Sequence, residues 1–209
     1  MKFLLLPILF LLFFSNCATQ SSNPKLVGAP CQGCEAVLEY DEQQIKSIDT
    51  LPLFHSATHP LKISGTIYKA DGKTPAAGVV LYIYHTDEEG IYPSKGNEKT
   101  WARRHGHLRA WLKTDEAGQY TFYTGKPASY PGRTVAAHIH PTILEPNGRY
   151  YYVEDYYFAD DPYLTKRELH PQSPRGGTRG VLLLKQEAKL WVGKRDFILG
   201  KYIPNYGLN

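Results

Sequence analysis

The chain has 209 residues, of which 42% are hydrophobic and 21% charged, and its formal net charge is +4. This length is sufficient for one domain with a core of its own. Lysine and arginine are mixed with acidic residues and form no basic run, which argues against a nucleic-acid-binding protein. The aromatic content of 13%, with 16 tyrosines, is typical of β-structure.

Residues 1–17, "MKFLLLPILFLLFFSNC", have the layout of a secretory signal: a lysine, an apolar run and a small, polar exit. The run is too short to cross a bilayer, which needs about 20 residues. Ser15-Asn16-Cys17 resembles a bacterial lipobox, so we expect cleavage that leaves Cys17 carrying lipid. The alternative is an ordinary secreted protein with an incidental cysteine. We expect an exported protein, anchored by lipid alone at a bacterial membrane on its periplasmic or cell-surface side.

Residues 18–59 are interpreted as a tether and an N-terminal arm without a sustained hydrophobic period. Within them, "PCQGCEAV" contains the close pair Cys31 and Cys34. In an exported protein such a pair most simply forms a disulfide. A zinc site would need two more ligands of suitable spacing, and a redox role has little support because no helical pattern follows. We therefore expect a structural disulfide.

From residue 60 onward, strand patterns alternate with Gly, Asp, Asn and Pro turns. Ile63 and Ile67 share one face of "LKISGTIY", and Tyr120 and Phe122 share one face of "GQYTFYTG". Further strand candidates are "AGVVLYIYH", "RTVAAHIHPTIL", "RYYYVEDYYFAD", "TRGVLLLKQ" and "KLWVGKRDFIL"; only "DPYLTKREL" suggests a short helix. We predict an all-β domain over residues 60–209, an antiparallel β-sandwich of about seven to nine strands with long loops and little helix.

The strand over Val135–Ile143 contains two histidines, His138 and His140, whose spacing directs both to the same side. Buried imidazoles need partners, which hydrogen bonds or a metal ion can supply. Tyr92 and Tyr130 follow strand ends, where sites are commonly built. Phenolate is a hard anionic ligand, so two phenolates with two imidazoles favour ferric iron over zinc or copper(I). We predict an Fe(III) site formed by these four side chains.

Residues 60–203 resemble the intradiol ring-cleavage dioxygenases, non-haem iron(III) β-sandwich enzymes that open catechols between the two hydroxylated carbons. The similar segments are "HTDEEGIYP", "LKTDEAGQYTFYTGKPASYPGR" and "AHIH", while "RDFILGKYIPNY" and "CQGCEAV" are similar to exported members. The resemblance implies that a catechol-type substrate and dioxygen react at the iron and give a muconate-type diacid. It also implies that Tyr92 stays bound to the metal and that His138 and His140 complete the ligand set. Tyr130 would be displaced from the metal by the substrate and would then take a proton.

An arginine that the family usually carries three residues before the first histidine is replaced here by Val135. Arg133 lies two residues earlier, and we assign it the catalytic role of stabilising charge on the substrate. Arg109 could also reach the site, and His85, at a strand end, could support the ligands from behind.

Other features have simpler interpretations. His105 and His107 in "RRHGHLR" are expected to be surface or pocket-rim residues, and the aromatic run "YYYVEDYYF" is expected to pack in the core. Two other functions remain open: a non-catalytic, surface-anchored β-sandwich binding module of the same fold, and a structural lipoprotein whose histidine pair is only hydrogen-bonded.

Overall fold

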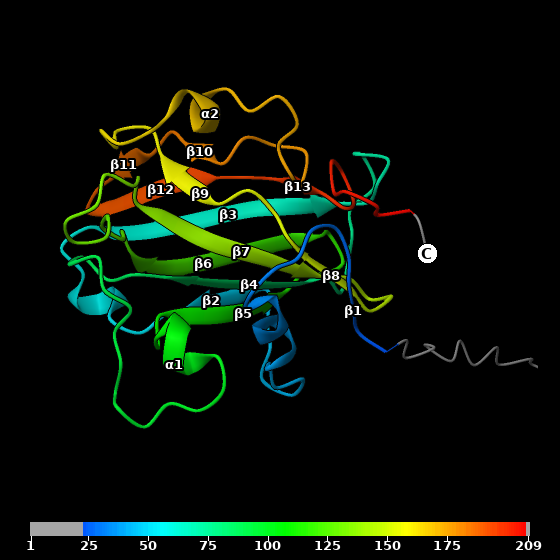
Figure 1. The fold of residues 1–209 in the computed structure, drawn as a ribbon, viewed down its shortest axis with the longest axis horizontal. Helices are drawn as coiled ribbons and strands as arrows, with labels where there is room; N and C mark the ends of the chain where they lie inside the picture. The colour runs from blue at the N-terminus through cyan, green and yellow to red at the C-terminus, as the bar shows by residue number, and fades with distance from the viewer. Residues whose placement is uncertain (1–22, 208–209) are drawn as a thin grey trace, which may run out of the picture.

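Two β-sheets packed face to face form the protein, and the only two α-helices among the described residues are one turn long (Figure 1). The computed structural model describes residues 23–207, so the predicted signal peptide and Cys17 lie outside the described residues. The helices are α1 (Ala102–His105) and α2 (Lys166–Leu169). The predicted all-β sandwich is confirmed. Between residues 23 and 207, no helix combines the length and hydropathy that crossing a membrane requires.

The larger sheet has seven strands and carries the histidine pair on its third strand. Its order is β1-β8-β7-β4-β5, with β9 pairing to β7 and β10 to β9. The bounds are β1 (Lys25–Leu26), β4 (Val80–His85), β5 (Arg109–Lys113), β7 (His138–Leu144), β8 (Arg149–Tyr152), β9 (Tyr156–Phe158) and β10 (Val181–Leu182).

The second sheet has six strands in the order β11-β12-β3-β6-β2, and β13 also pairs with β3. Its strands are β2 (Ile48–Thr50), β3 (Pro60–Tyr68), β6 (Gln119–Gly125), β11 (Lys185–Glu187), β12 (Leu190–Lys194) and β13 (Phe197–Ile198). Five pairings, β1–β8, β10–β9, β12–β3, β13–β3 and β2–β6, are parallel, so the sheets are mixed rather than purely antiparallel.

The inner core fills the space between the two sheets. Strict alternation in β3 and β6 directs Ile63 and Ile67, and Tyr120 and Phe122, into this core, as predicted. β7 contributes the residues between its polar ones, such as Ile139, which is fully buried. Strand alternation therefore places one face of β7 in the core and leaves His138 and His140 on its other face.

An outer cluster covers that second face of the larger sheet. The N-terminal arm packs there through the 3-10 helix η1 (Cys34–Leu38), shown in blue beside β5 in Figure 1. The buried members of the outer cluster come from the arm and from outward-facing positions of β4, β7 and β8: Cys34, Ala36, Val37, Val80, Tyr82, Leu144 and Tyr150. Among the described residues before this helix, β1 pairs with β8 and Val27 is buried.

Several predicted strands are shorter or divided. The predicted strand over Val135–Ile143 begins only at His138. The run "RYYYVEDYYF" divides into β8 and β9, which pair with opposite ends of β7. The break lies opposite Pro141, whose carbonyl accepts a hydrogen bond from Val153 N but which has no N–H to donate in return. The interruption leaves Asp155 beside His140.

Candidate metal centre

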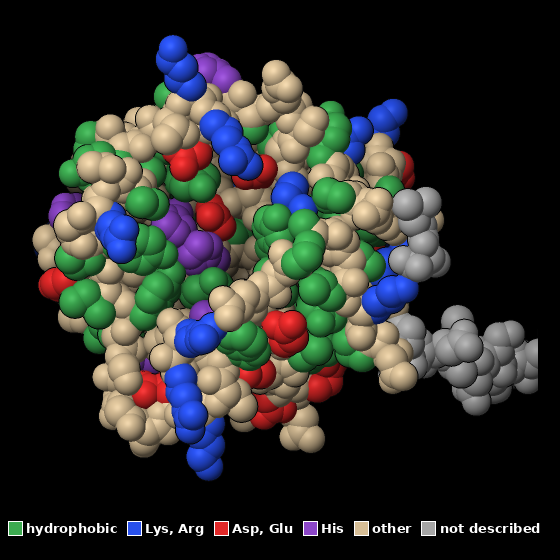
Figure 2. Space-filling model, viewed as in Figure 1, with side chains coloured by type: hydrophobic (Ala, Val, Ile, Leu, Met, Phe, Trp, Pro, Cys, Tyr) green, Lys and Arg blue, Asp and Glu red, His purple; other side chains and the backbone are tan. Residues whose placement is uncertain are grey.

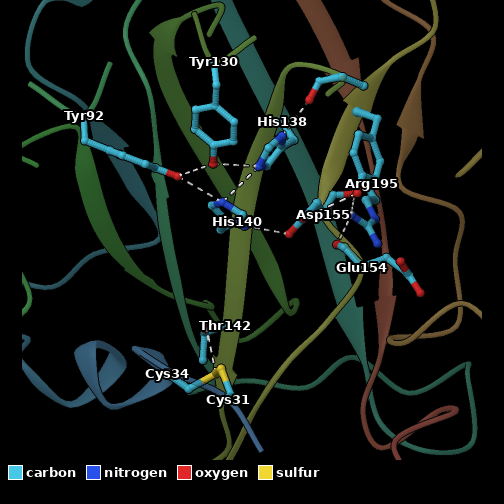
Figure 3. Close-up of polar contacts among 12 residues, drawn as sticks. Cys31, Cys34, Tyr92, Tyr130, His138, His140, Thr142, Glu154, Asp155 and Arg195 are labelled. Atoms are coloured by element: carbon cyan, nitrogen blue, oxygen red, sulfur yellow. Dashed lines mark hydrogen bonds and ion pairs between the residues drawn. A yellow bond between two sulfur atoms is a disulfide. The ribbon is translucent and has the colours of Figure 1, made fainter. Parts of the chain in front are cut away.

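Three parts of the chain bring the four predicted ligands together. β7 presents His138 and His140, the turn after β6 presents Tyr130, and the loop after β4 presents Tyr92 (Figure 3). The two tyrosine loops pack closely, because a Cβ atom added at Gly90 would collide with the backbone carbonyl of Ser129. A glycine at this position therefore allows the two phenols to meet.

The four donor atoms form a closed ring of short contacts. The Tyr92 and Tyr130 hydroxyls are 2.8 Å apart, and the Nε2 atoms of His138 and His140 are 3.0 Å apart. The remaining sides are 3.3 Å from the Tyr130 hydroxyl to His138 Nε2, and 3.2 Å from the Tyr92 hydroxyl to His140 Nε2. Atoms that share a metal ion at about 2.0–2.2 Å lie about 3 Å from one another, so the ring has the dimensions of a ligand set.

The outer nitrogens of both histidines fix their tautomers. His138 Nδ1 donates to the carbonyl oxygen of Ala136 at 2.7 Å, and His140 Nδ1 donates to Asp155 Oδ1 at 3.0 Å. A carbonyl and a carboxylate only accept, so each Nε2 is left with a lone pair. Two lone pairs that face each other at 3.0 Å cannot hydrogen-bond to one another, whereas a cation between them would satisfy both. The donor set therefore fits a metal ion.

Electrostatics favour the neutral forms of His138 and Tyr92 in the absence of a cation. Burial lowers the pKa of His138, and the neighbouring His140 lowers it further. Burial also raises the pKa of Tyr92, as does its hydrogen bond with Tyr130. A bound cation would offset this penalty, because opposite charge favours the phenolate.

Asp155 and Arg195 support the pair from behind, and sequence reasoning missed both. Burial alone would raise the pKa of Asp155, but the charge and hydrogen bond of His140 hold it below its usual value. Arg195 is 3% exposed, and its Nη1 donates to the carbonyl oxygens of Glu154 and Asp155 at 2.6 and 3.0 Å. Arg195 thereby fixes the backbone on both sides of the Asp155 peptide (Figure 3). Such partners orient metal-ligating imidazoles.

The two arginines expected near the site have different surroundings. Arg133 is exposed in the turn after Tyr130, and Val135 is also exposed. Arg109 forms an ion pair with Glu39 of the N-terminal arm at 2.7 Å. The catalytic role assigned to Arg133 therefore stays a prediction, whereas the guanidinium of Arg109 is held by the arm.

The other histidines also differ from expectation. His85 is buried, but it bonds to the Thr86 carbonyl oxygen and the Thr124 hydroxyl rather than to the predicted ligands. His105 was expected at the surface or at a pocket rim, and the surface position is wrong, because His105 is 5% exposed. Its Nδ1 lies 2.7 Å from the Tyr82 hydroxyl and its ring stacks on Tyr84, so it belongs to the packing over the outer sheet face.

The arm closes one side of this region. Cys31 and Cys34 form a disulfide with a Cα–Cα distance of 5.7 Å, and the Thr142 hydroxyl lies 3.8 Å from Cys34 Sγ. Thr142 follows His140 by two residues on the same face of β7, so the disulfide lies beside the next outward-facing residue after His140 (Figure 3). In the space-filling view, histidine side chains border a hollow in this side of the molecule (Figure 2).

Sequence comparison finds related proteins. A family model described as dioxygenase matches residues 39–194. Catechol 1,2-dioxygenase 1 of Acinetobacter lwoffii is 38% identical over 71 residues, which cover 34% of this chain and 22% of that protein. Catechol 1,2-dioxygenase of Acinetobacter baylyi is 36% identical over 72 residues, with the same shares. The chain thus spans about a fifth of the length of the curated relatives it matches.

Solved structures share the fold. The dioxygenase domain of a dioxygenase carbohydrate-binding protein fusion from Streptomyces sp. SirexAA-E superimposes with a TM-score of 0.56 at 21% identity, covering 84% of this chain and 98% of that one. An intradiol ring-cleavage dioxygenase from Tetranychus urticae gives 0.53 at 21% identity, with 85% and 94% covered. 3-Chlorocatechol 1,2-dioxygenase from Rhodococcus opacus 1CP gives 0.57 at 20%, with 88% and 75% covered.

Proposed function

This chain belongs to the intradiol ring-cleavage dioxygenase family, and we propose that it cleaves a catechol-type ring with dioxygen at a ferric ion, giving a muconate-type diacid. The ion is held by Tyr92, Tyr130, His138 and His140. The observation that carries the proposal is the convergence of their four donor atoms, with both imidazole lone pairs directed inward. The donor set of two phenols and two imidazoles is the chemical reason to choose iron(III).

Iron(III), when bound, supplies a Lewis acid that orients the two substrate oxygens and draws electron density from the ring. The residues of this chain have separate tasks around it. Asp155, fixed by Arg195, keeps the proton of His140 on Nδ1, so that the lone pair of Nε2 remains available to the metal. The Ala136 carbonyl oxygen does the same for His138.

Tyr130 is the residue proposed to move a proton. Its hydroxyl is held between the Tyr92 hydroxyl and His138 Nε2, and its ring comes from the turn after β6. The Tyr92 ring lies beside the Tyr84 ring, with centroids 5.9 Å apart. As the phenolate, Tyr130 can accept a substrate hydroxyl proton, because phenol and catechol hydroxyls have similar acidities. Tyr92 then stays in place as the second phenolate.

Colour and iron content test the metal site. Iron(III)-loaded protein should be red to purple, because tyrosinate bound to ferric iron absorbs visible light. Tyr130→Phe should shift the band and His138→Ala should lose the iron. Tyr163→Phe, at an exposed tyrosine, serves as the matched control and should leave the spectrum unchanged. Oxygen uptake with catechol and detection of the ring-opened diacid test turnover; a colourless protein without iron would contradict the proposal.

A non-catalytic binding module with the same metal site is the second candidate. The ion pair of Arg109 with Glu39 and the exposed Val135 at the position of the usual arginine favour it, because neither residue supplies a free guanidinium to the substrate. In that case catechol would change the iron spectrum under air without oxygen uptake.

We further propose that the protein is exported and anchored through lipid on Cys17. The Cys31–Cys34 disulfide supports export, because such bonds persist in oxidising compartments. Expression of the full chain with radiolabelled palmitate should label the protein, and Cys17→Ser should abolish the label and release the protein from membranes. Unlabelled wild-type protein would exclude the lipid anchor.

A further inference from the structure

The carbonyl group that orients His138 belongs to a peptide unit that is itself held by a carboxylate. His138 Nδ1 donates to the carbonyl oxygen of Ala136 at 2.7 Å. The N–H of the same peptide unit is that of Ala137, and it donates to Asp161 Oδ2 at 2.8 Å. One peptide unit therefore joins His138 to Asp161, with the imidazole on its oxygen and the carboxylate on its nitrogen.

This peptide unit is buried just before β7 begins. Ala136 and Ala137 are 1% and 4% exposed, and the first residue of the strand is His138. A buried N–H needs an acceptor, because leaving it unpaired costs about as much free energy as a lost hydrogen bond. Asp161 supplies that acceptor, so its carboxylate fixes the plane of the peptide unit and, with it, the direction of the Ala136 carbonyl group.

Asp161 is held for this contact by its own turn, in the loop between β9 and α2 (Figure 1). Its N–H donates to the Phe158 carbonyl oxygen at 3.0 Å, and the Tyr163 N–H donates to Asp161 Oδ1 at 2.9 Å. The pairing of Tyr157 with His138 brings this turn beside the start of β7. One carboxylate oxygen is thus engaged within the turn, which leaves the other for Ala137.

The contact should also change the chemistry of the imidazole. Hydrogen bonds in a chain polarise one another where water is excluded. An anionic acceptor on the peptide N–H moves electron density toward the Ala136 carbonyl oxygen, which strengthens the bond from His138 Nδ1 and makes Nε2 a better electron donor. His140 has the same support without the intervening peptide, because its Nδ1 donates directly to Asp155. Each imidazole of the pair is therefore backed by a carboxylate.

We propose that Asp161 is a positioning residue of the metal centre, and that it acts through the Ala136–Ala137 peptide unit to orient His138 and to raise its donor strength toward the metal ion. The inference rests on the proposed function only in taking iron(III) as that ion. A simpler role for Asp161 would be to form its turn. Asp161→Asn separates the two roles, because asparagine forms the same kind of turn and can accept from the Ala137 N–H but lacks the charge.

Iron binding by the full-length protein is the first test. Chelator competition should show iron(III) affinity falling about three- to tenfold in Asp161→Asn, less than the loss of about 10–100-fold typical of direct partners, because the effect passes through a peptide. The tyrosinate band should move to longer wavelength, since a weaker imidazole donor leaves the iron a stronger electron acceptor. Asp160→Asn is the matched control: it removes the same charge one residue away, from an exposed carboxylate paired with Lys126, and should change neither quantity.

NMR of the iron-free protein labelled with ¹⁵N at histidine is the second test, and it needs no metal. The Nδ1 proton of His138 should move upfield in Asp161→Asn because its hydrogen bond weakens, while that of His140 should stay in place. An unchanged His138 proton, or an iron affinity and band equal to those of Asp160→Asn, overturns the proposal and leaves the iron site standing. Wild-type protein that takes up no iron contradicts the proposed function instead, and the NMR result alone then decides whether Asp161 orients His138.

Discussion

The two faces of the larger sheet are built on different principles. Its inner face packs against the second sheet in a core of strand residues that alternate with exposed ones. Its outer face is covered by an N-terminal arm that has little regular structure. The outer cluster contains tyrosines and a disulfide cysteine, and the buried His105 stacks on Tyr84 beside it. The inner face provides rigidity, and the outer face provides the candidate site.

Strand β7 has one side in the inner core and the other side at the candidate site. Ile139 and Ile143 are fully buried on the inner face, whereas His138, His140 and Thr142 face outward. The metal centre thus stands on a strand whose other side is fixed in the core, which is how precise sites are usually supported. Changes in the inner core should therefore alter stability most, and changes in the outer cluster should alter the site more than the fold.

The largest effect on stability is expected from the inner core. Phe122 is fully buried between the sheets, where it contacts the edge of the Tyr156 ring. Phe122→Ala removes a large aromatic group and leaves a cavity, which costs about 3–5 kcal/mol of unfolding free energy. Urea denaturation measures it. Thr121→Ala on the opposite face of the same strand is the control, and a loss of similar size there would contradict the division into two faces.

Acid should weaken both faces, each through a buried neutral histidine. Burial lowers the pKa of His85, at the inner face, and of His105, in the packing over the outer face, to about 4. Each is unprotonated in the fold but titrates at about 6.5 in the unfolded chain. Stability is therefore complete above pH 6.5 and falls as the pH drops toward 4, by up to about 1.4 kcal/mol per pH unit for each histidine.

The variant His105→Phe separates the two contributions. Phenylalanine can keep the stack on Tyr84 but cannot take up a proton, so stability between pH 6.5 and 5 should fall less steeply than in wild type. Thermal unfolding at a series of pH values measures the slope. An unchanged slope would mean that His105 does not contribute to the acid sensitivity.

Local sequence patterns could predict the inner face but only part of the outer one. Alternation in β3 and β6 identifies the buried side chains without knowledge of their partners. The histidine spacing and two tyrosines after strand ends were sufficient to propose which side chains meet. The arm residues that follow Cys34 have no period, because they pack on a sheet face formed by strands far along the chain.

Asp155 illustrates why the remaining part of the site was missed. It lies in "YYYVEDYYF", which has the composition of one continuous strand. The kink that directs it toward His140 arises opposite Pro141 of the neighbouring strand, and Arg195 fixes it from near the end of the chain. Neither contact leaves a local signal. The exposed position of Arg133 has the same origin, since β7 begins later than its alternating pattern indicates.

Asp155→Asn should affect the site and spare the fold. The amide keeps the shape of Asp155 but loses the charge that orients and polarises His140, so iron affinity should fall about 10–100-fold. Competition with a chelator of known affinity measures the change, and urea denaturation of iron-free protein checks the fold. Asp160→Asn, at an exposed carboxylate paired with Lys126, is the control. Equal iron affinities in wild type and Asp155→Asn would show that the carboxylate does not support the centre.

The smallest effect concerns a single hydrogen bond under the arm. The Tyr82 hydroxyl is buried and lies 2.7 Å from His105 Nδ1. This contact helps to keep the His105 ring stacked on Tyr84, under the turn that contains Cys31 and Cys34. Tyr82→Phe removes the bond with little change in packing, so the expected loss of stability is about 1 kcal/mol. Because Tyr84 also stacks on His140, Tyr82→Phe should shift the visible band of iron-loaded protein slightly. The control is Tyr120→Phe, which removes a hydroxyl from the inner core and should lower stability without moving the band. A band that responds to Tyr120→Phe and not to Tyr82→Phe would reverse the roles assigned to the two faces.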